Sequence, residues 1–308
     1  MLRNQISVVL PTYNRATTVG RSIESVLDQA VDVEVIVVDD GSTDNTKSVI
    51  AALKDDRVKY IRQQNAGSSA ARARGVQEAI GHWLLFLDSD DYLLPGMLTT
   101  LLDLARKSDQ VGFVFCECWF EDIKRGTRSP AITLPEGDGR RIAQFVTIHS
   151  QCYNCRFLIR RSAYDAIGGY DPEIRLGAPE LMVFVPLFSR FAFARTPERL
   201  AVVCDGAKFR LSRQAALLFD GWSKVVEKLA RDEDILKIIT PVLPHARAQQ
   251  LILCGESLYS QNEFHSARVA FISAIRSDPF IVVRRSQNPA TYIAKSYLRQ
   301  MLGLRNKN

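Results

Sequence analysis

The sequence predicts an α/β protein in which a mostly parallel sheet is flanked by helices and followed by an α-helical C-terminal region. Two observations carry this prediction. Before residue 100, short β-branched runs alternate with segments of helical periodicity, which is the pattern of a parallel sheet covered on both faces. From about residue 214 onward, the apolar spacing is helical.

The predicted elements follow the chain in order. Four strands come first: ISVVLP (6–11), VEVIVVDD (33–40), VKYIRQ (58–63) and WLLFLD (83–88). Helical spacing marks the segments between them: Val19, Ile23, Val26 and Leu27, then Val49, Ile50 and Leu53, then residues 69–80. This alternation indicates successive strand–helix units.

Beyond residue 100 the pattern loosens. The expected elements are a helix (98–107), a strand (111–120), a Gly/Pro-punctuated stretch (124–139), and a strand, short helix and Gly turn within 157–170. Residues 255–279 have the spacing of one tetratricopeptide-like helix pair. We therefore divide the chain into an α/β domain (1–213) and a helical C-terminal region (214–308).

Polar clusters follow all four N-terminal strands where each strand ends. They are PTYNR, DDGSTD, QQNAGSSAAR and DSDD, in chain order. In open parallel sheets, ligands bind outside the carboxyl ends of the strands. The sequence therefore predicts a ligand site at that edge.

The fourth cluster places Asp88, Asp90 and Asp91 inside an otherwise apolar segment, WLLFLDSDDYLLP. Ionised carboxylates are costly at a buried strand end unless a cation or hydrogen-bond donors meet them. Carboxylates two residues apart, as in Asp88 and Asp90, suit a hard divalent cation that bridges to a diphosphate. The alternative is an Asp-rich turn in which Asp91 caps the next helix.

Composition and charge indicate an ordinary globular chain: 308 residues, 46% hydrophobic, net charge +6. Residues 281–308 carry six basic residues and no acid, which accounts for the whole excess. This end could contact an anionic membrane, or it could be a solvated helix face. Without a secretory pattern or a spanning apolar run, we expect a cytoplasmic protein, at most peripheral at the inner face of the membrane, with no nucleic-acid partner.

Cysteines form two close pairs, Cys116/Cys118 and Cys152/Cys155. Four thiolates could hold zinc if the pairs meet. The simpler interpretation is burial, because CECWF continues the strand-like run VGFVF and free cysteine is among the most buried residue types. Disulfides are not expected in a reducing compartment.

Taken together, VVLPTYNR, VVDDGSTDNT, NAGSSAARARG and LLFLDSDDYLLP resemble the family 2 glycosyltransferases in order and spacing, over roughly residues 5–205. The resemblance implies the Rossmann-like GT-A fold. It implies an inverting transfer from a nucleoside-diphosphate-sugar, first of all a UDP-sugar, to an acceptor hydroxyl, assisted by Mg²⁺ or Mn²⁺. The acceptor would be a glycan or lipid-linked molecule in bacterial surface-glycan or glycolipid synthesis.

The same resemblance implies a nucleobase pocket. Pro11, Thr12 and Tyr13 would line it, and Tyr13 offers a ring that can stack on the base. Asp40 would accept the imide hydrogen of uracil, and Asp39 would support that loop.

On the sugar side, the resemblance places Arg72 near the ribose or diphosphate. Asp88 would hold the ribose side, and Asp90 would bind the metal. Ala73 departs from the family, which often has Asn there.

The catalytic base is a second departure. Family members usually show Glu-Asp after a Gly-Gly-Phe/Tyr-Asp segment, which is present here at 168–171. Ala178-Pro179-Glu180 stands where the pair should fall, so the resemblance makes Glu180 the candidate base. A positioned general base typically contributes about 10²–10⁴-fold to the rate.

Two functions of different classes remain open. The chain is either an active glycosyltransferase or a catalytically impaired nucleotide-sugar-binding scaffold whose helical end contacts partners. The intact Asp-x-Asp favours the enzyme, and the altered base motif leaves room for the scaffold. A Rossmann dehydrogenase lacks support, since no G-x-G-x-x-G follows the first strand.

Overall fold

The structure is a computed structural model that describes residues 5–150, 152–204, 215–281, 289–290 and 292–294. The described residues form two compact units. The first unit contains residues 5–142, 152–175 and 179–204, and the second contains residues 143–150, 176–178 and those described from 215 onward.

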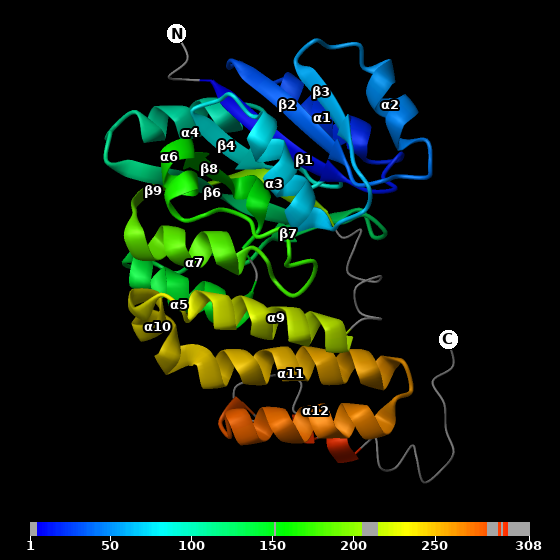
Figure 1. Cartoon of the computed structure of the whole chain (residues 1–308), viewed down its shortest axis with the longest axis vertical. Coiled ribbons are helices and arrows are strands. Elements are labelled where there is room, and N and C mark those ends of the chain that lie inside the picture. The colour runs from blue at the N-terminus through cyan, green and yellow to red at the C-terminus, as the bar shows by residue number, and fades with distance from the viewer. Residues whose placement is uncertain (1–4, 151, 205–214, 282–288, 291, 295–308) are drawn as a thin grey trace. The chain divides into compact units, whose positions relative to one another are not determined.

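The first unit is built on one sheet with the strand order β3-β2-β1-β4-β8-β6-β9-β5, and β7 pairs with β6 (Figure 1). The strands are β1 (Ile6–Thr12), β2 (Val33–Asp39), β3 (Val58–Arg62), β4 (Trp83–Phe86), β5 (Tyr92–Leu93), β6 (Val111–Asp122), β7 (Thr127–Pro130), β8 (Phe157–Arg160) and β9 (Ala192–Cys204). The first four pair in parallel, as predicted. Beyond β4 the sheet is mixed, since β8 runs antiparallel to both β4 and β6.

Helices pack on both faces of the parallel half. The helices of the first unit include α1 (Val19–Leu27), α2 (Thr46–Ala52), α3 (Ser68–Glu78), α4 (Met97–Ala105), η2 (Asn154–Arg156), α6 (Arg161–Ala166) and α7 (Leu181–Arg190). Val8 and Val35 belong to the core cluster that includes α1 and α4. Val9 and Val38 point the opposite way, toward Gly75 of α3. The helix lies so close here that a Cβ added to Gly75 would be only 2.4 Å from the Val9 side chain. Alternate strand residues thus fill two cores, as the double-sided apolar pattern predicts.

Helix α7 and strand β9 are among the elements that the sequence did not predict. Helix α7 contains Pro186, which removes a backbone donor from the helix. Most of its side chains are nevertheless buried, and this packing outweighs the local cost. Strand β9 contains the polar segment 196–199 but pairs along most of the length of β6, so a long neighbouring strand supplies the pairing that local propensity does not.

The second unit is helical in its described residues. It contains most of α5 (Gly139–His149), together with α9 (Ala215–Leu229), α10 (Glu233–Ile239), η4 (Thr240–Val242), α11 (Leu243–Ser260) and α12 (Phe264–Ser277). The predicted helix pair corresponds to the end of α11 and to α12, which pack against each other. Gly255 permits this contact, because a side chain at this position would place its Cβ only 2.7 Å from the Phe271 ring, which is too close. The six basic residues of 281–308 lie outside the described residues.

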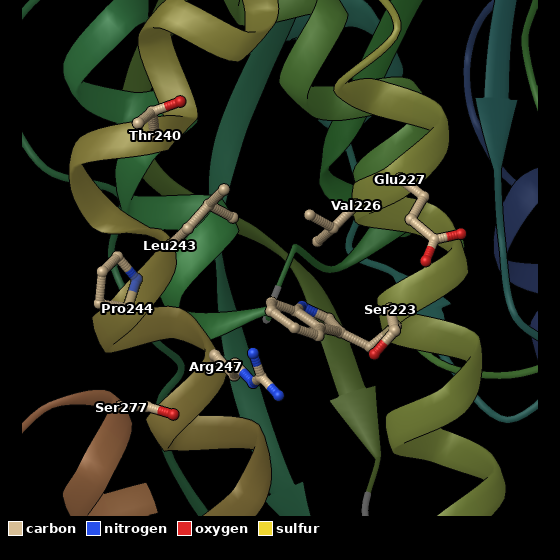
Figure 2. Close-up of a pocket in the computed structure, with 9 residues that line it drawn as sticks. Ser223, Val226, Glu227, Thr240, Leu243, Pro244, Arg247 and Ser277 are labelled. Carbon is tan, nitrogen blue, oxygen red and sulfur yellow. The ribbon is translucent and has the colours of Figure 1, made fainter.

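A cavity of about 640 Å³ lies in the second unit (Figure 2). Its lining residues are Trp222, Ser223, Val226, Glu227, Thr240, Leu243, Pro244, Arg247 and Ser277. Val226 on α9 and Leu243 on α11 face each other across it (Figure 2). None of the predicted site residues lines this cavity. Within the described part of the chain, no helix is long and apolar enough to cross a membrane.

Candidate active site

The polar ends of the four parallel strands meet at one edge of the sheet. Thr12 at the end of β1 lies in register with Asp39 at the end of β2. The Thr12 carbonyl accepts a hydrogen bond from the backbone N–H of Asp40 (2.8 Å). The backbone N–H of Leu87, just after β4, donates to the carbonyl of Val9 on β1 (3.0 Å), which brings Asp88 to the same edge. The predicted convergence is confirmed.

The loop after β1 presents Tyr13, whose side chain is half-exposed. Its neighbour Asn14 has a positive φ of 53°. The Asn14 backbone N–H donates to Ser42 Oγ (2.9 Å), and its Oδ1 accepts from the backbone N–H of Thr43 (2.8 Å). The loop is therefore tied to the loop after β2, with an exposed ring beside it. Pro11 and Thr12 lie in β1 and are buried, and their role in base binding stays a prediction.

Asp39 and Asp40 are buried, and hydrogen bonds satisfy both carboxylates. Asp39 accepts from the backbone N–H of Ser42 (2.7 Å) and from the Tyr60 hydroxyl (2.6 Å). Burial, together with the bond to Asp39, raises the pKa of Tyr60 to about 12. These contacts hold the loop after β2 in place, and the role of Asp39 at a nucleotide site stays a prediction.

Asp40 holds the loop that follows β3. Its Oδ1 accepts from Gln63 Nε2 and from the backbone N–H of Ala66, and its Oδ2 accepts from the backbone N–H of Gly67, all at 2.8 Å. A carboxylate has about four lone-pair sites. Three are therefore in use, and one is left for a donor such as an imide N–H.

The acids after β4 have a different environment. Asp90 and Asp91 are both buried. Burial and the neighbouring charge of Asp88 raise the pKa of Asp90. Burial raises the pKa of Asp91 well above its usual range, and the charges of Asp88 and Asp90 add to that effect. Asp91 does not cap the next helix, since Gly96 is the N-cap residue of α4. Asp91 Oδ1 accepts instead a hydrogen bond from the backbone N–H of Cys204 (2.9 Å).

Two arginines lie beside these acids, and neither was predicted as a site residue from the sequence. Arg15 Nη2 is 3.5 Å from Asp90 Oδ2. Arg21 Nη2 donates to the Asp90 carbonyl (2.9 Å), and its guanidinium lies over the Tyr92 ring, 4.4 Å from the ring centre. Arg15 could have been found from the sequence, because it belongs to the polar cluster PTYNR at the first strand end. Arg21 lies within α1, and no motif marks it.

The acid group fits a divalent cation in its chemistry. Mg²⁺ prefers hard oxygen ligands, uses only one or two carboxylates, and takes its other ligands from water and phosphate. The mutual repulsion of Asp88 and Asp90 is the kind of strain that a bound cation relieves. No group of three or more His, Cys, Asp or Glu side chains placed to hold a metal occurs among the described residues, so substrate and water would have to supply further ligands.

Arg72 connects the acid group to Glu180. It is buried on α3, and its Nη2 lies 2.6 Å from Asp88 Oδ1. Its Nη1 lies 3.9 Å from Glu180 Oε1. The structure thus brings together three of the residues predicted from the sequence, from α3, the end of β4 and the start of α7.

Glu180 immediately precedes α7, as its N-cap residue. Its side chain keeps 24% of its surface exposed. Burial of the carboxyl group raises the pKa of Glu180, and the Arg72 charge opposes that shift. A partly accessible carboxylate with a raised pKa is suited to accept a proton.

The cysteine pairs are buried in the first unit, as expected for core residues. Burial raises the pKa of Cys116 to about 12 and that of Cys118 to about 11, which disfavours the thiolates that zinc needs. No three of these four described cysteines form a metal-ligand group. A buried ion pair lies among them instead, with Arg156 Nη2 3.2 Å from Glu117 Oε2.

A parallel sheet that gathers polar loops, acids and arginines at its carboxyl edge is the architecture of a nucleotide-binding α/β protein. The family model described as Glycosyl transferase family 2 matches residues 7–168. This match covers more than half of the 308 residues, and the chain belongs to that family.

Known relatives agree with this membership. The GalNAc(5)-diNAcBac-PP-undecaprenol beta-1,3-glucosyltransferase of Campylobacter jejuni is 40% identical over 122 residues, which are 38% of this chain and 39% of the relative. The chain therefore matches only about two fifths of that relative's length.

Solved structures share the fold. S. aureus TarS 1-349 in complex with UDP-GlcNAc has a TM-score of 0.56 at 14% identity and covers 98% of this chain and 93% of that one. The mannosyltransferase PcManGT of Pyrobaculum calidifontis, in complex with GDP-Man and Mn²⁺, has a TM-score of 0.57 at 17% identity. The match covers 96% of this chain and 80% of PcManGT. At these identities the likeness concerns the fold alone.

Proposed function

We propose that this chain is an inverting glycosyltransferase that moves a sugar from a nucleoside-diphosphate-sugar, first of all a UDP-sugar, to an acceptor hydroxyl. One observation carries the proposal. The buried guanidinium of Arg72 lies 2.6 Å from Asp88 on the donor side and 3.9 Å from Glu180. A candidate base and an acid group suited to a cation therefore lie at the same edge of the sheet.

The nucleotide half of the edge supports a uracil-type base. Tyr13 offers an exposed ring for stacking. Asp40 keeps one lone-pair site beyond its three existing hydrogen bonds. TarS is solved with UDP-GlcNAc and PcManGT with GDP-Man, so both donor types belong in an assay.

The proposed step is a direct displacement at the anomeric carbon. Glu180 takes the proton of the acceptor hydroxyl while that oxygen forms a bond to the carbon. The bond from the carbon to the diphosphate oxygen breaks, and the nucleoside diphosphate leaves with the electron pair. Attack on the face opposite the leaving group inverts the configuration at the carbon.

The chain's own charges support the leaving group. Asp90, with Asp88 beside it, would hold Mg²⁺ or Mn²⁺, and the ion when bound supplies positive charge to the leaving diphosphate. Arg15 and Arg21 add cationic side chains next to Asp90. Arginine matches phosphate oxygens well because its guanidinium donates two parallel hydrogen bonds.

For the acceptor, we propose a glycan or lipid-linked molecule of bacterial surface-glycan or glycolipid synthesis. The C. jejuni relative, whose name describes a lipid-linked substrate, supports this choice. We also propose a cytoplasmic protein that contacts anionic membrane through the basic residues of 281–308, where no acid offsets six positive charges.

The decisive experiment measures donor hydrolysis by purified protein with a panel of UDP-, GDP- and dTDP-sugars, with and without Mn²⁺. Release of the nucleoside diphosphate from one donor, dependent on Glu180, supports the enzyme. Tight UDP binding with no hydrolysis or transfer from any donor would instead favour a nucleotide-sugar-binding scaffold.

A further inference from the structure

The Gly-Gly-Tyr-Asp segment at 168–171 places the backbone of Tyr170. Gly168 and Gly169 both have positive φ, of 81° and 65°. A Cβ added at Gly169 would lie only 2.4 Å from the Tyr164 ring, so the second glycine lets this ring approach. The Tyr164 hydroxyl in turn accepts a hydrogen bond from the Tyr170 backbone N–H (2.9 Å). The two glycines therefore serve the placement of the tyrosine that follows them.

The side chain of Tyr170 is buried and held by two further contacts. Its hydroxyl donates a hydrogen bond to Asn154 Oδ1 (2.5 Å). Its ring makes a T-shaped contact with Phe86 of β4, with 5.1 Å between the ring centres. An aromatic ring that is bonded at its hydroxyl and packed against a second ring cannot turn freely, so these contacts fix its plane.

The Arg72 guanidinium lies over this ring, with its Cζ 5.0 Å from the ring centre. The Arg72 side chain is only 3% exposed. Its Nη2 lies 2.6 Å from Asp88 Oδ1 and its Nη1 lies 3.9 Å from Glu180 Oε1. Its buried Nε has no hydrogen-bond partner among the described residues. An aromatic face attracts a cation most strongly where water is excluded, so Tyr170 supplies a contact to the guanidinium that hydrogen bonds do not complete.

We propose that Tyr170 is a positioning residue, which holds the Arg72 guanidinium between Asp88 and Glu180. At 3.9 Å, Arg72 is close to Glu180 without being hydrogen-bonded to it. A shift of the guanidinium toward Glu180 would complete that bond and occupy the lone pairs that must take the acceptor's proton. The fixed ring opposes this shift. The inference rests on the proposed function, in which Arg72 connects the donor side to the candidate base.

NMR of arginine side chains in the full chain tests the contact without an assay of activity. ¹⁵N spectra report how fast each guanidinium rotates about its Nε–Cζ bond, and the signal that is absent from Arg72→Lys belongs to Arg72. Tyr170→Leu removes the aromatic face and keeps an apolar side chain. In this variant the Arg72 rotation should be about 10-fold faster, a factor that corresponds to a cation–π contact of ordinary strength.

Two milder variants decide the question if Tyr170→Leu fails to fold. Tyr170→Phe and Asn154→Ala keep an aromatic ring at position 170 and remove the same hydrogen bond. Each should speed the Arg72 rotation by the same factor, smaller than that of Tyr170→Leu. Because they remove one shared contact, combining them should speed it no further. Unequal or additive effects would contradict the proposed hold on the ring.

Phe113→Leu is the matched control for the loss of a buried ring. Phe113 belongs to the same unit, and its aromatic contacts are with the rings of other phenylalanines: Phe115, Phe157, Phe188 and Phe193. This variant should lose stability because a buried ring is truncated. The rotation of Arg72 should remain that of the wild type.

Donor hydrolysis measures the consequence for the reaction. In Tyr170→Leu, kcat should fall about 10- to 100-fold, up to the cost of misplacing a catalytic group by about 1 Å. Tyr170→Phe should recover most of this loss, because it retains the ring under Arg72. Folded Phe113→Leu should keep the wild-type kcat.

Different results overturn the inference and the proposed function. An Arg72 rotation that is unchanged in Tyr170→Leu, or that changes equally in Phe113→Leu, overturns the positioning role of Tyr170. A wild-type kcat in folded Tyr170→Leu overturns it as well. If the wild-type protein releases no nucleoside diphosphate from any donor, the proposed function is wrong, and the NMR measurement still decides whether Tyr170 holds Arg72.

Discussion

Two pairs of acids lie at the same edge of the sheet and differ in the hydrogen bonds and neighbouring charges around their carboxylates. Asp39 and Asp40 follow β2, and backbone N–H groups and side-chain donors satisfy both of them. Asp90 and Asp91 follow β4. Burial raises the pKa of each, and so does the charge of Asp88, to which Asp90 adds in the case of Asp91. The first pair is held by hydrogen bonds from the protein. In the second pair the charges of Arg15 and Arg21 do not fully offset the burial and the neighbouring acids.

The difference indicates a division of labour. Carboxylates with satisfied hydrogen bonds stabilise the loops around them, so Asp39 and Asp40 should matter for stability as well as for nucleotide binding. Carboxylates held close together without full compensation are a common feature of functional sites. Asp90 should therefore matter for binding a cation and the diphosphate, and little for folding.

The largest expected effect is in Asp90→Ala. Because this carboxylate contributes the proposed cation ligand, the variant should lose the Mn²⁺-dependent part of its UDP affinity and keep its fold. Calorimetry with UDP and Mn²⁺ measures the affinity, and circular dichroism the fold. Asp103→Ala, which removes an exposed acid on α4 paired with Arg106, is the control. Wild-type Mn²⁺ dependence in Asp90→Ala would contradict the assignment.

Glu180→Gln should lower donor hydrolysis by about two to four orders of magnitude, the usual contribution of a general base. UDP affinity should stay unchanged, because Gln keeps the shape of the side chain and the proposed nucleotide-binding residues remain in place. The pKa of Glu180 is raised, so wild-type activity should fall as pH drops through a value above that of an ordinary glutamate. A pH–rate profile checks this, and the acid limb should be absent from any residual activity of the variant.

Asp40→Asn tests the pair that follows β2, Asp39 and Asp40. The amide cannot accept from all three donors, so at least one partly buried N–H loses its partner, and the free energy of unfolding should fall by about 2 kcal/mol. UDP affinity should weaken as well, since a neutral group replaces the anionic acceptor. Urea denaturation measures the stability. Unchanged stability would remove the contrast between the two pairs.

Tyr13→Ala should weaken UDP binding by about 2 kcal/mol, the size of a typical base–aromatic stacking contact. Stability should hardly change, because the ring is half-exposed. Titration with UDP and with UMP checks whether the loss belongs to the base and not to the diphosphate. An equal affinity in wild type and variant would place the nucleobase elsewhere.

The smallest effect is expected in Tyr60→Phe, which removes one hydrogen bond to Asp39 and should cost about 1 kcal/mol of stability. The pKa of Tyr60 is about 12 in the folded protein, against about 10 in an unfolded chain. Between these values the folded state retains a proton that the unfolded state has lost. Wild-type stability should therefore decline as pH rises from about 10 to about 12, and this component should be missing in Tyr60→Phe.

Much of the parallel half could be predicted from the sequence, because its signals are local. Apolar runs such as 33–40 and the polar residues that end them mark strands and their carboxyl ends without knowledge of distant partners. The chain order of strand–helix units then places those ends at one edge. Asp39, Asp40, Asp88 and Asp90 were found in this way.

The mixed half was less predictable. Strand β9 is paired along β6 in spite of its polar segment, and α7 contains Pro186. Both form because long-range packing outweighs local propensity, and no window of sequence contains that information. The alternative in which Asp91 caps the next helix fails for a related reason, since the partner of Asp91 is the N–H of Cys204, 113 positions away.

The sequence by itself determined the family, the parallel core and the polar residues at its strand ends, since periodicity, turn residues and motif spacing are written along the chain. Only the tertiary structure decided which charges meet. That Arg72 joins Asp88 to Glu180 depends on packing between segments far apart in sequence. Burial and neighbouring charges, which set the pKa of Glu180 and Asp90, arise from that packing.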